Sequence, residues 1–358
     1  MITIVLTNRN RDLNTIKNCL DSLKKQSNQD FELFFVDYGS NEDYVLELEQ
    51  LISKYSQLQF IKCPVSGQLW NKCRAINIAL NKCAMPYFFV GDIDMLFHPD
   101  FVSTLYQLKN ENVVTYFQVG FLSKNETLLN KDFFNSKVDF TSQKETTGMT
   151  LYPTELLKKI NGYDEFYHGW GAEDTDVHLR LRNLEITVNF YDKDVFLKHR
   201  WHPKTYRTNQ SSDPYHFMLE KINHSYIQVA ENNKTVKANR HKPWGVMPEI
   251  TMYTKLSGVL DCNIQIESEK TKLIGLLAQF SNFEDRSISV LVKDVPRKDK
   301  IKQFIKKILG RKHKTFLSMK TINDMILFEI VSNYRNSPYH YFFDQNRNEI
   351  YLKIHLSQ

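Results

Sequence analysis

The chain has 358 residues, of which 42% are apolar and 25% are charged. This composition is ordinary for a soluble globular protein, the length is enough for two domains, and a chain dominated by disorder is excluded. The formal net charge of +6 is concentrated in residues 297–314, where nine Lys or Arg face one acid and the remaining 340 residues carry a net −2. We expect no nucleic-acid partner, because the basic excess is local.

Neither a membrane span nor a disulfide framework is indicated. No run approaches the roughly 18 to 20 apolar residues that cross a bilayer, and the strand-like residues 2–7 lack the longer apolar core of a signal peptide. The five cysteines are odd in number and form no CxxC pair, so we expect reduced core thiols rather than a zinc site. A cytoplasmic protein of bacterial type is therefore expected.

Strand-like and helical patterns alternate along the N-terminal part of the chain. Apolar runs that end in polar or turn-forming residues predict strands at 2–7, 31–36, 58–63 and 86–90, and amphipathic spacing predicts helices at 12–26, 42–55 and 68–83. This alternation predicts an α/β fold, a Rossmann-like doubly wound and mostly parallel sheet with right-handed crossovers.

Polar residues follow three of these strands. Ligands of such sheets bind beyond the carboxyl ends of the strands, so residues at these ends are candidates for a common site. They are Asn8, Arg9 and Arg11 after the first strand, Asp37 after the second, and Asp92 and Asp94 after the fourth.

The rest of the chain predicts further strands and a second domain. Strands are predicted at 113–119 and 186–191, and the polar segment 123–143 predicts a loop over the site. Two prolines and a glycine near 244–249 indicate a boundary. We predict a catalytic-type domain over 1–245 and a smaller mixed α/β domain over 251–358, with strands at 287–292 and 349–355.

Residues 162–182, GYDEFYHGWGAEDTDVHLRLR, place three carboxylates within four residues beside Trp170 and two glycines. The pattern is helical from residue 172, so Glu173 and Asp174 fall in a first turn, where the helix dipole favours ionised acids. In the simplest interpretation they are ordinary first-turn acids, Asp176 pairs with Arg180, and Trp170 only packs. A second acidic site upstream favours a functional interpretation.

That second site is the pair Asp92 and Asp94. Two carboxylates separated by one apolar residue point to one side of an extended segment and suit a hard divalent ion that also holds phosphate oxygens, although a solvated turn has the same pattern. His199 offers the nitrogen ligand of a Mn²⁺-type site, with His98 and His202 as competitors. Cationic residues at loops or helix starts could meet a diphosphate: Arg9, Arg11, Arg74 and Lys72, the last with a solvated surface position as an equal alternative.

Several segments, taken in order, resemble glycosyltransferase family 2: NRNR at 8–11, VDYGSNED at 36–43, LWNKCRAINIAL at 69–80 and GDID at 91–94. The segment GYDEFYHGWGAEDTD at 162–176 resembles the C-terminal motif shared by the beta-1,4-galactosyltransferases and the chondroitin polymerases. The ordered set is more specific than any single motif. The resemblance covers about residues 1–240 and does not extend to 251–358.

The resemblance implies a GT-A fold, a UDP-sugar donor and an inverting reaction. In donor binding, Asp37 resembles the uracil-contacting acid, Asn8, Arg9 and Arg11 the nucleotide-binding loop, and Arg74 a contact of the donor diphosphate. Trp170 and Gly171 are also counted among the donor-binding residues, and Trp170 would stack on a sugar.

For the metal, Asp92 and Asp94 match the DxD motif, with Asp94 as the direct ligand, and His199 matches the metal-binding histidine. Galactosyltransferases have Met where Phe196 stands here, which leaves the preference between Mn²⁺ and Mg²⁺ open. For catalysis, Asp174 matches the general base and Glu173 its acceptor-orienting neighbour. An inverting transfer needs one carboxylate to take the acceptor's proton and a metal to neutralise the departing diphosphate.

Residues 298–314, KDKIKQFIKKILGRKHK, predict a basic amphipathic helix. Ile301, Phe304, Ile305 and Ile308 share one helical face, and lysines occupy the other. This pattern is used at anionic membrane surfaces, and it is equally typical of a helix packed on its own domain. The first interpretation places the protein at the inner face of the membrane, where contact would serve a lipid-linked acceptor.

The sequence thus favours a metal-dependent inverting glycosyltransferase that moves a hexose or N-acetylhexosamine to a glycan or lipid-linked glycan acceptor in surface polysaccharide synthesis. A sugar-1-phosphate nucleotidyltransferase is the alternative enzyme, disfavoured because the first strand lacks a Gly-rich phosphate loop. A non-catalytic glycan-binding protein is the alternative outside enzymes. The donor sugar, the linkage and the oligomeric state are left open.

Overall fold

The structure is a computed structural model that describes residues 1–203 and 214–356. The chain divides into two compact units. The first comprises Met1–Cys63, Trp70–Lys204 and Asn223–Met247, and the second comprises Pro64–Leu69, Thr205–Ile222 and Pro248–Gln358. The break after Met247 lies within the stretch where prolines indicated a boundary. The inclusion of Pro64–Leu69 in the second unit differs from the predicted continuous domain 1–245.

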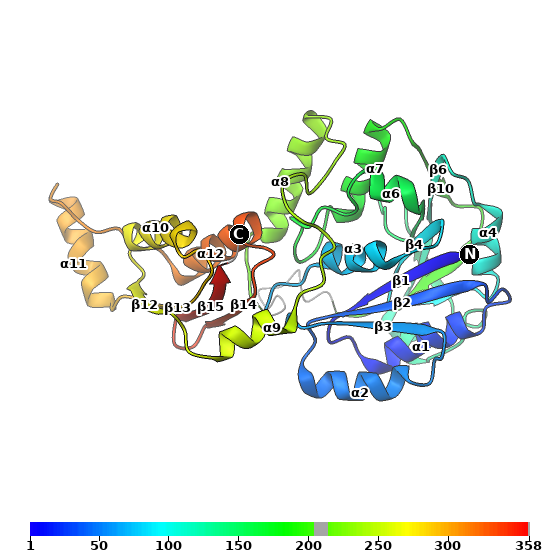
Figure 1. The fold of residues 1–358 in the computed structure, drawn as a ribbon, viewed down its shortest axis with the longest axis horizontal. Coiled ribbons are helices and arrows are strands. Elements are labelled where there is room, and N and C mark those ends of the chain that lie inside the picture. The colour runs from blue at the N-terminus through cyan, green and yellow to red at the C-terminus, as the bar shows by residue number, and fades with distance from the viewer. Residues whose placement is uncertain (204–213, 357–358) are drawn as a thin grey trace. The chain divides into compact units, whose positions relative to one another are not determined.

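Among the described residues, the first unit contains a seven-stranded sheet in the order β10-β6-β9-β4-β1-β2-β3 (Figure 1). Its strands are β1 Ile2–Asn8, β2 Phe31–Tyr38, β3 Leu58–Cys63, β4 Tyr87–Asp92, β6 Val113–Phe117, β9 Thr150–Pro153 and β10 Thr187–Tyr191. Only β9, within this sheet, runs antiparallel to its neighbours β4 and β6. The predicted mostly parallel α/β sheet is therefore confirmed.

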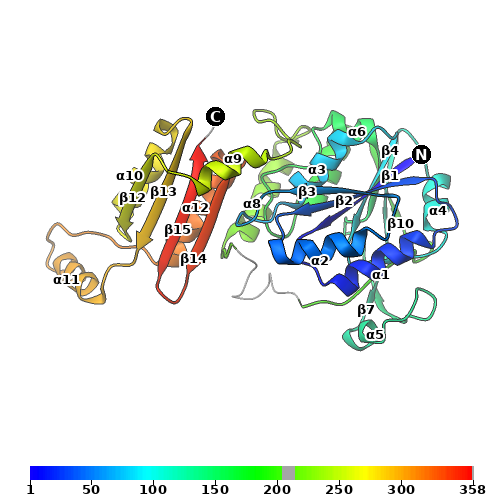
Figure 2. The ribbon, with the colours of Figure 1, turned by 60° about the horizontal axis from the view of Figure 1, so that its bottom comes forward.

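Helices cover both faces of this sheet, as a doubly wound fold requires. Figures 1 and 2 show α1 and α2 on one face and α3, α6 and α7 on the other. The helices of this unit are α1 Leu13–Lys24, α2 Glu42–Ile52, α3 Lys72–Lys82, α4 Phe101–Gln107, α5 Lys124–Leu128, α6 Thr154–Lys159 and α7 Glu173–Asn183, and α8 Leu219–Asn232 crosses from the second unit into the first. The buried stripe of α1, which includes Ile16 and Leu20, arises from the spacing that predicted the helix.

A second sheet in the first unit has the order β5-β11-β7-β8. It consists of β5 Met95–Phe97, β7 Val119–Leu122, β8 Val138–Thr141 and β11 Leu197–His199. The predicted single strand 113–119 is thereby corrected, because the chain leaves the large sheet after β6 and enters this one at β7. The predicted loop 123–143 is also corrected, since it contains α5 and β8.

Phenylalanines form the core beneath the end of β4. Phe89, Phe97, Phe101 and Phe117 are all buried, and their rings contact one another with centroid separations of 5.0 to 6.4 Å. Such aromatic pairs contribute about 0.5–1.5 kcal/mol each beyond the burial of their area. Because Phe89 precedes Asp92 and Phe97 follows Asp94, this cluster fixes the backbone that carries both acids.

The second unit is a smaller mixed α/β assembly, as predicted for 251–358. Its four-stranded sheet, in the described residues, has the order β12-β13-β15-β14, with β12 parallel to β13 and the other pairs antiparallel. The strands are β12 Cys262–Glu267, β13 Arg286–Lys293, β14 Tyr339–Asp344 and β15 Glu349–Leu356, and the helices are α9 Ile250–Thr254, α10 Lys270–Gln279, α11 Arg297–Ile308 and α12 Met319–Asn333. Figure 2 shows α10 and α12 against the sheet and α11 standing apart from it.

All five cysteines are free, and four of them are buried: Cys19, Cys63, Cys73 and Cys83. Within residues 1–203 and 214–356, no helix has the length and apolar character that a membrane crossing would require.

A buried ion pair anchors α7. Arg180 Nε lies 2.7 Å from Asp176 Oδ2, with both side chains almost fully buried, and Arg180 Nη1 donates to the Ile160 carbonyl at 2.9 Å. The predicted pairing of Asp176 with Arg180 is confirmed. Both groups are inside the protein, so each depends on the other for compensation of its charge.

We expect Arg180→Ala to lower the free energy of unfolding by about 3–5 kcal/mol, because it leaves the Asp176 carboxylate buried and uncompensated. Equilibrium urea unfolding measures this loss. The matched control is Lys17→Ala, which removes an exposed pair at the same helical spacing with Asp21 at 2.5 Å and should cost about 0.5 kcal/mol or less. Equal losses for the two variants would contradict the assignment of Arg180 as the anchor of α7.

Candidate active site

The carboxyl ends of β1, β2 and β4 bring the predicted polar residues together. In the parallel register Asn8 is opposite Asp37, and Thr7 is opposite Asp92. Asn8 Nδ2 donates to Asp37 Oδ1 at 2.7 Å, and the Ser40 hydroxyl donates to the same oxygen at 2.5 Å. Burial raises the pKa of Asp37, against the lowering effect of these hydrogen bonds. The carboxylate thus joins the loops that follow the first two strands.

A cluster of one carboxylate and two imidazoles lies beside this edge. Asp94 is buried, and its Oδ1 is 3.5 Å from His199 Nε2 while its Oδ2 is 3.3 Å from His202 Nε2. One ligand atom from each of the three residues lies within 4.8 Å of the others. The sequence named His199 as the ligand and His202 as a competitor, whereas the structure brings both to Asp94.

Strand pairing explains this cluster. β5 begins directly after Asp94 and runs antiparallel to β11, with His199 opposite Met95. The Arg200 amide donates to the Asp94 carbonyl at 2.9 Å, which continues the pairing by one step. Residues more than a hundred positions apart in sequence are therefore held at one point by backbone hydrogen bonds.

The donor set could hold a divalent metal ion. One carboxylate oxygen and two imidazole nitrogens form a mixed set that suits a first-row transition metal better than Mg²⁺, which prefers oxygen ligands only. Burial lowers the pKa of His199, against the raising effect of the Asp94 charge. Burial would raise the pKa of Asp94, but His199, His202 and Arg11 together hold it well below its usual range, so the carboxylate is ionised.

Arg11 balances the charge of this cluster. Its Nη2 lies 2.6 Å from Asp94 Oδ2 and 3.4 Å from His202 Nε2. A guanidinium beside the carboxylate supplies positive charge where the three ligand atoms converge. Because the Arg11 side chain is 30% exposed, it retains access to solvent from this position.

The other histidine candidate and Phe196 lie in the aromatic core. The ring of His98 packs edge-on against Phe133, Phe134 and Phe196, with centroids 5.0 to 5.1 Å away. His98 is therefore no part of the Asp94 cluster. Phe196, at the position where galactosyltransferases have Met, also packs on Phe101 and Tyr191.

Lys72 lies among three carboxylates at the start of α3. Its Nζ is 3.0 Å from Asp92 Oδ1, 3.5 Å from Asp174 Oδ2 and 3.8 Å from Glu173 Oε1. Burial would lower the pKa of Lys72, but Asp174, Asp92 and Glu173 outweigh it and raise the pKa well above the ordinary value. The solvated position considered for this lysine is wrong, because its side chain is only 14% exposed.

The two acids that begin α7 are unlike ordinary first-turn residues. Burial and the neighbouring Asp174 charge raise the pKa of Glu173 to about 7. Burial also raises the pKa of Asp174, against the lowering effect of Lys72. Acids of perturbed pKa beside a buried lysine are typical of functional sites.

Hydrogen bonds between α3 and residues 162–171 hold Lys72 against α7. Asn77 Nδ2 donates to the Tyr163 carbonyl and its Oδ1 accepts from the Tyr163 amide, both at 2.8 Å. Asn71 Nδ2 donates to the Glu165 carbonyl at 2.9 Å, and the buried Glu165 carboxylate accepts from Asn77 at 3.0 Å and from the Gly245 amide at 2.6 Å. These asparagines and Glu165 are positioning residues that no sequence pattern singled out.

A strained turn carries Trp170 into α7. Gly169, Gly171 and Ala172 have φ values of 72°, 101° and 72°, and for Ala172 this left-handed conformation is costly. The Trp170 ring is 43% exposed, so packing in a core does not explain it. The Asn223 side chain of α8 donates hydrogen bonds to the carbonyls of His168 at 2.9 Å and of Trp170 at 3.4 Å. These bonds stabilise the turn.

The remaining predicted cations differ in position. Arg9 is half-buried. Burial raises the pKa of Asp37 and of Tyr38, and the positive charge of Arg9 opposes this rise. Arg74 is buried on α3, where Nη2 donates to the Val246 carbonyl at 3.3 Å. The structure therefore places Lys72, rather than Arg74, among the carboxylates of Asp92, Glu173 and Asp174.

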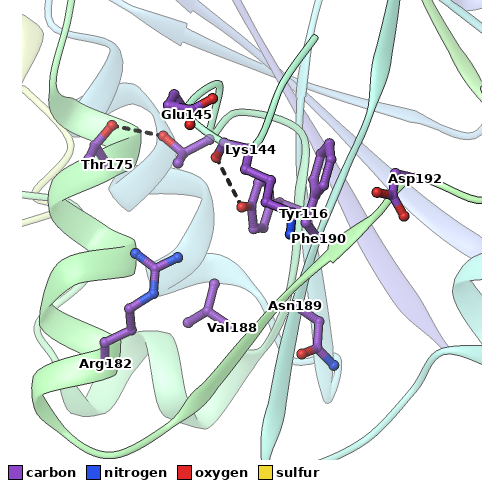
Figure 3. A pocket seen from close by; sticks show the side chains of 10 residues that line it. Tyr116, Lys144, Glu145, Thr175, Arg182, Val188, Asn189, Phe190 and Asp192 are labelled. Carbon is purple, nitrogen blue, oxygen red and sulfur yellow. Dashed lines mark hydrogen bonds between the residues drawn. The ribbon is translucent and has the colours of Figure 1, made fainter. Parts of the chain in front are cut away.

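A surface hollow of about 680 Å³ borders α7 and the edge strand β10. Figure 3 shows Arg182 and Thr175 of α7 on one side and Tyr116, Phe190 and Asn189 on the other. Of the described residues that line it, none is a predicted site residue. One of the residues that line it, Thr175, follows Asp174 in α7, and its hydroxyl lies 2.9 Å from that of Thr147.

The sheet carries acids at the ends of its strands, and a second pair of acids stands at the start of α7. Residues 3–155 match the family Glycosyl transferase family 2, and residues 130–203 match the family described as N-terminal domain of galactosyltransferase. The chain is thus similar to glycosyl transferase family 2 over residues 3–155, which are somewhat less than half of its length.

Individual relatives are more distant. A teichoic acid poly(glycerol phosphate) polymerase of Staphylococcus epidermidis is 33% identical over 94 residues, which are 26% of this chain and 12% of that protein. This chain thus spans only a small part of its curated relative.

The solved structures to which this chain is similar include the following three. S. aureus TarS has 14% identity and a TM-score of 0.42, covering 55% of this chain and 60% of that one. The structure of GalNAc-T7 with UDP, GalNAc and Mn²⁺ has 13% identity and a TM-score of 0.43, and the match covers 57% of this chain and 44% of that one. The mannosyltransferase PcManGT of Pyrobaculum calidifontis, in complex with GDP-Man and Mn²⁺, has 15% identity and a TM-score of 0.42. That match covers 65% of this chain and 71% of that one.

Proposed function

We propose that this protein is a metal-dependent inverting glycosyltransferase. It moves a hexose or N-acetylhexosamine from a UDP-sugar to a hydroxyl of a glycan acceptor in the synthesis of a bacterial surface polysaccharide. The observation that carries the proposal is a candidate metal site and a second cluster of acids with a buried lysine, both beside the carboxyl end of β4. One is the Asp94–His199–His202 cluster, and the other is Glu173 and Asp174 with Lys72.

The first group and its neighbours would bind the donor. Asp94, His199 and His202 would hold a divalent ion, which neutralises charge on the departing diphosphate when it is bound. Asp37 and Asn8 shape the pocket for the nucleotide base. Arg11, which balances Asp94 and is partly exposed, would turn its guanidinium to a phosphate oxygen of the donor.

The second group would act on the acceptor. Asp174 takes the proton of the attacking hydroxyl while that oxygen bonds to the anomeric carbon and the bond from this carbon to the phosphate oxygen breaks, with UDP as the leaving group. Lys72 keeps Asp174 ionised by offsetting its charge in a buried place. Glu173 orients the acceptor, and Trp170 stacks on a sugar face.

The proposal is tested with a panel of UDP-sugars, with GDP-mannose as the control nucleotide. Release of UDP is measured with Mn²⁺, with Mg²⁺ and with EDTA, and binding of UDP is measured by calorimetry. We expect metal-dependent release from one UDP-sugar and none from GDP-mannose. Absence of UDP release from every donor, together with absence of UDP binding, would overturn the proposal. Binding of UDP without turnover, in the presence of glycan acceptors, would instead indicate a non-catalytic binding protein.

A further inference from the structure

The helix α11, Arg297–Ile308, has an apolar stripe that the second unit does not cover. All twelve of its side chains are exposed or half-exposed. Ile301 is 50% exposed, Phe304 60%, Ile305 50% and Ile308 69%, and these positions recur at the spacing of one helical face. The alternative in which this helix packs its apolar face on its own domain is therefore not observed.

Two ion pairs hold the ends of this segment to the second unit. Lys300 Nζ lies 2.7 Å from Asp294 Oδ1, and Lys314 Nζ lies 2.8 Å from Glu269 Oε2. The segment is thus attached through two of its own cations, while the apolar stripe faces solvent. Other cations of the segment are exposed: Arg297, Lys298, Lys302, Lys307, Arg311 and Lys312.

We propose that α11 docks on a lipid surface that contains anionic headgroups. Ile301, Phe304, Ile305 and Ile308 enter the boundary between headgroups and acyl chains, and the surrounding lysines and arginines bind the headgroup phosphates. Charge complementarity favours this occupant. Asp299 is the single acid among residues 297–314, so the surface that fits the helix is strongly anionic at its rim and apolar beneath.

Other occupants fit less well. A nucleic acid would match the cations but would leave four large apolar side chains in water. A second copy of the chain would offer the helix a surface with a net charge of −2 outside residues 297–314, which is a weak complement to a local +8. The lipid proposal is independent of the proposed glycosyl transfer, because it requires neither donor nor acceptor.

The test is flotation of the full chain with two kinds of vesicle, phosphatidylcholine alone and phosphatidylcholine mixed with phosphatidylglycerol. We expect the chain to float with the mixed vesicles only, and salt to weaken the binding. In the variant Phe304→Glu the partition coefficient should fall roughly tenfold or more, because insertion of one large apolar side chain is lost. The matched control is Phe342→Glu, which changes a phenylalanine of similar exposure, 56%, on β14 and should float as the native chain does.

Three outcomes would overturn the proposal. The first is that the native chain does not float with the mixed vesicles. The second is that Phe304→Glu and Phe342→Glu lose flotation equally. Self-association of the native chain that Phe304→Glu abolishes, without any vesicle binding, would assign the face to a second copy instead. Circular dichroism of each variant checks folding, and UDP binding by calorimetry reports the first unit separately.

Discussion

Replacement of Asp174 by asparagine is expected to lower the rate of glycosyl transfer by about 10²- to 10⁴-fold, the usual contribution of a positioned general base. Asparagine keeps the shape of the side chain but cannot accept the acceptor's proton. The ion pairs of Asp94 are with Arg11, His199 and His202, and Asp174 pairs with Lys72 instead, so binding of UDP and metal should be largely retained. The loss is therefore expected in kcat and kcat/KM together, with donor affinity retained in calorimetry.

The neighbouring acid provides the control. With a pKa raised to about 7, Glu173 carries a proton in a substantial fraction of molecules near neutral pH, whereas Lys72 lies closer to Asp174 and favours its ionised form. Glu173→Gln imitates the protonated form and should retain far more activity than Asp174→Asn. If the glutamine variant lost as much rate as the asparagine variant, with UDP binding intact in both, the two roles assigned here would have to be exchanged or shared.

Much of the first unit follows from local patterns. The run at residues 2–7 predicted β1, and Asp12, which caps α1 by accepting from the Thr15 amide at 2.8 Å, stands where that helix was expected to begin. Asp37 and Asp92 were placed correctly at the sheet edge, because parallel strands separated by helices bring their carboxyl ends together. These inferences need only hydrophobic periodicity and the handedness of crossovers.

Long-range pairing is what the sequence could not predict. The antiparallel insertion of β9 between β4 and β6, and the pairing of β5 with β11, depend on segments that are far apart in the chain. The spacing of His199 and His202 offered a signal for a two-histidine site, but only the register of β11 decides that both reach Asp94. For Lys72, a lysine at a helix start has the same pattern whether it faces solvent or three carboxylates.

Asp94→Asn is expected to remove metal-dependent transfer almost completely, with a loss on the order of 10³-fold or more. The ion's stabilisation of transition-state charge is worth several kcal/mol, and each 1.4 kcal/mol is about tenfold in rate. Asp94 is the anionic member of the cluster, and its replacement also deprives Arg11 of the carboxylate that it contacts at 2.6 Å. Titration with Mn²⁺, followed by the paramagnetic signal of the free ion, should show loss of the site.

Variants of the histidines test whether both His199 and His202 bind the metal together with Asp94. His199→Ala and His202→Ala should each weaken Mn²⁺ binding by at least the roughly ten- to hundredfold that loss of an outer-shell partner costs, because each removes a direct ligand. His98→Ala, whose ring packs on phenylalanines, should leave the metal affinity unchanged. Loss of binding in His199→Ala but not in His202→Ala would return the site to the single histidine that the sequence favoured. Unchanged Mn²⁺ affinity in Asp94→Asn would be more serious, because the ion would then lie elsewhere. The convergence of β5 and β11 would in that case serve only to bury Asp94 with Arg11.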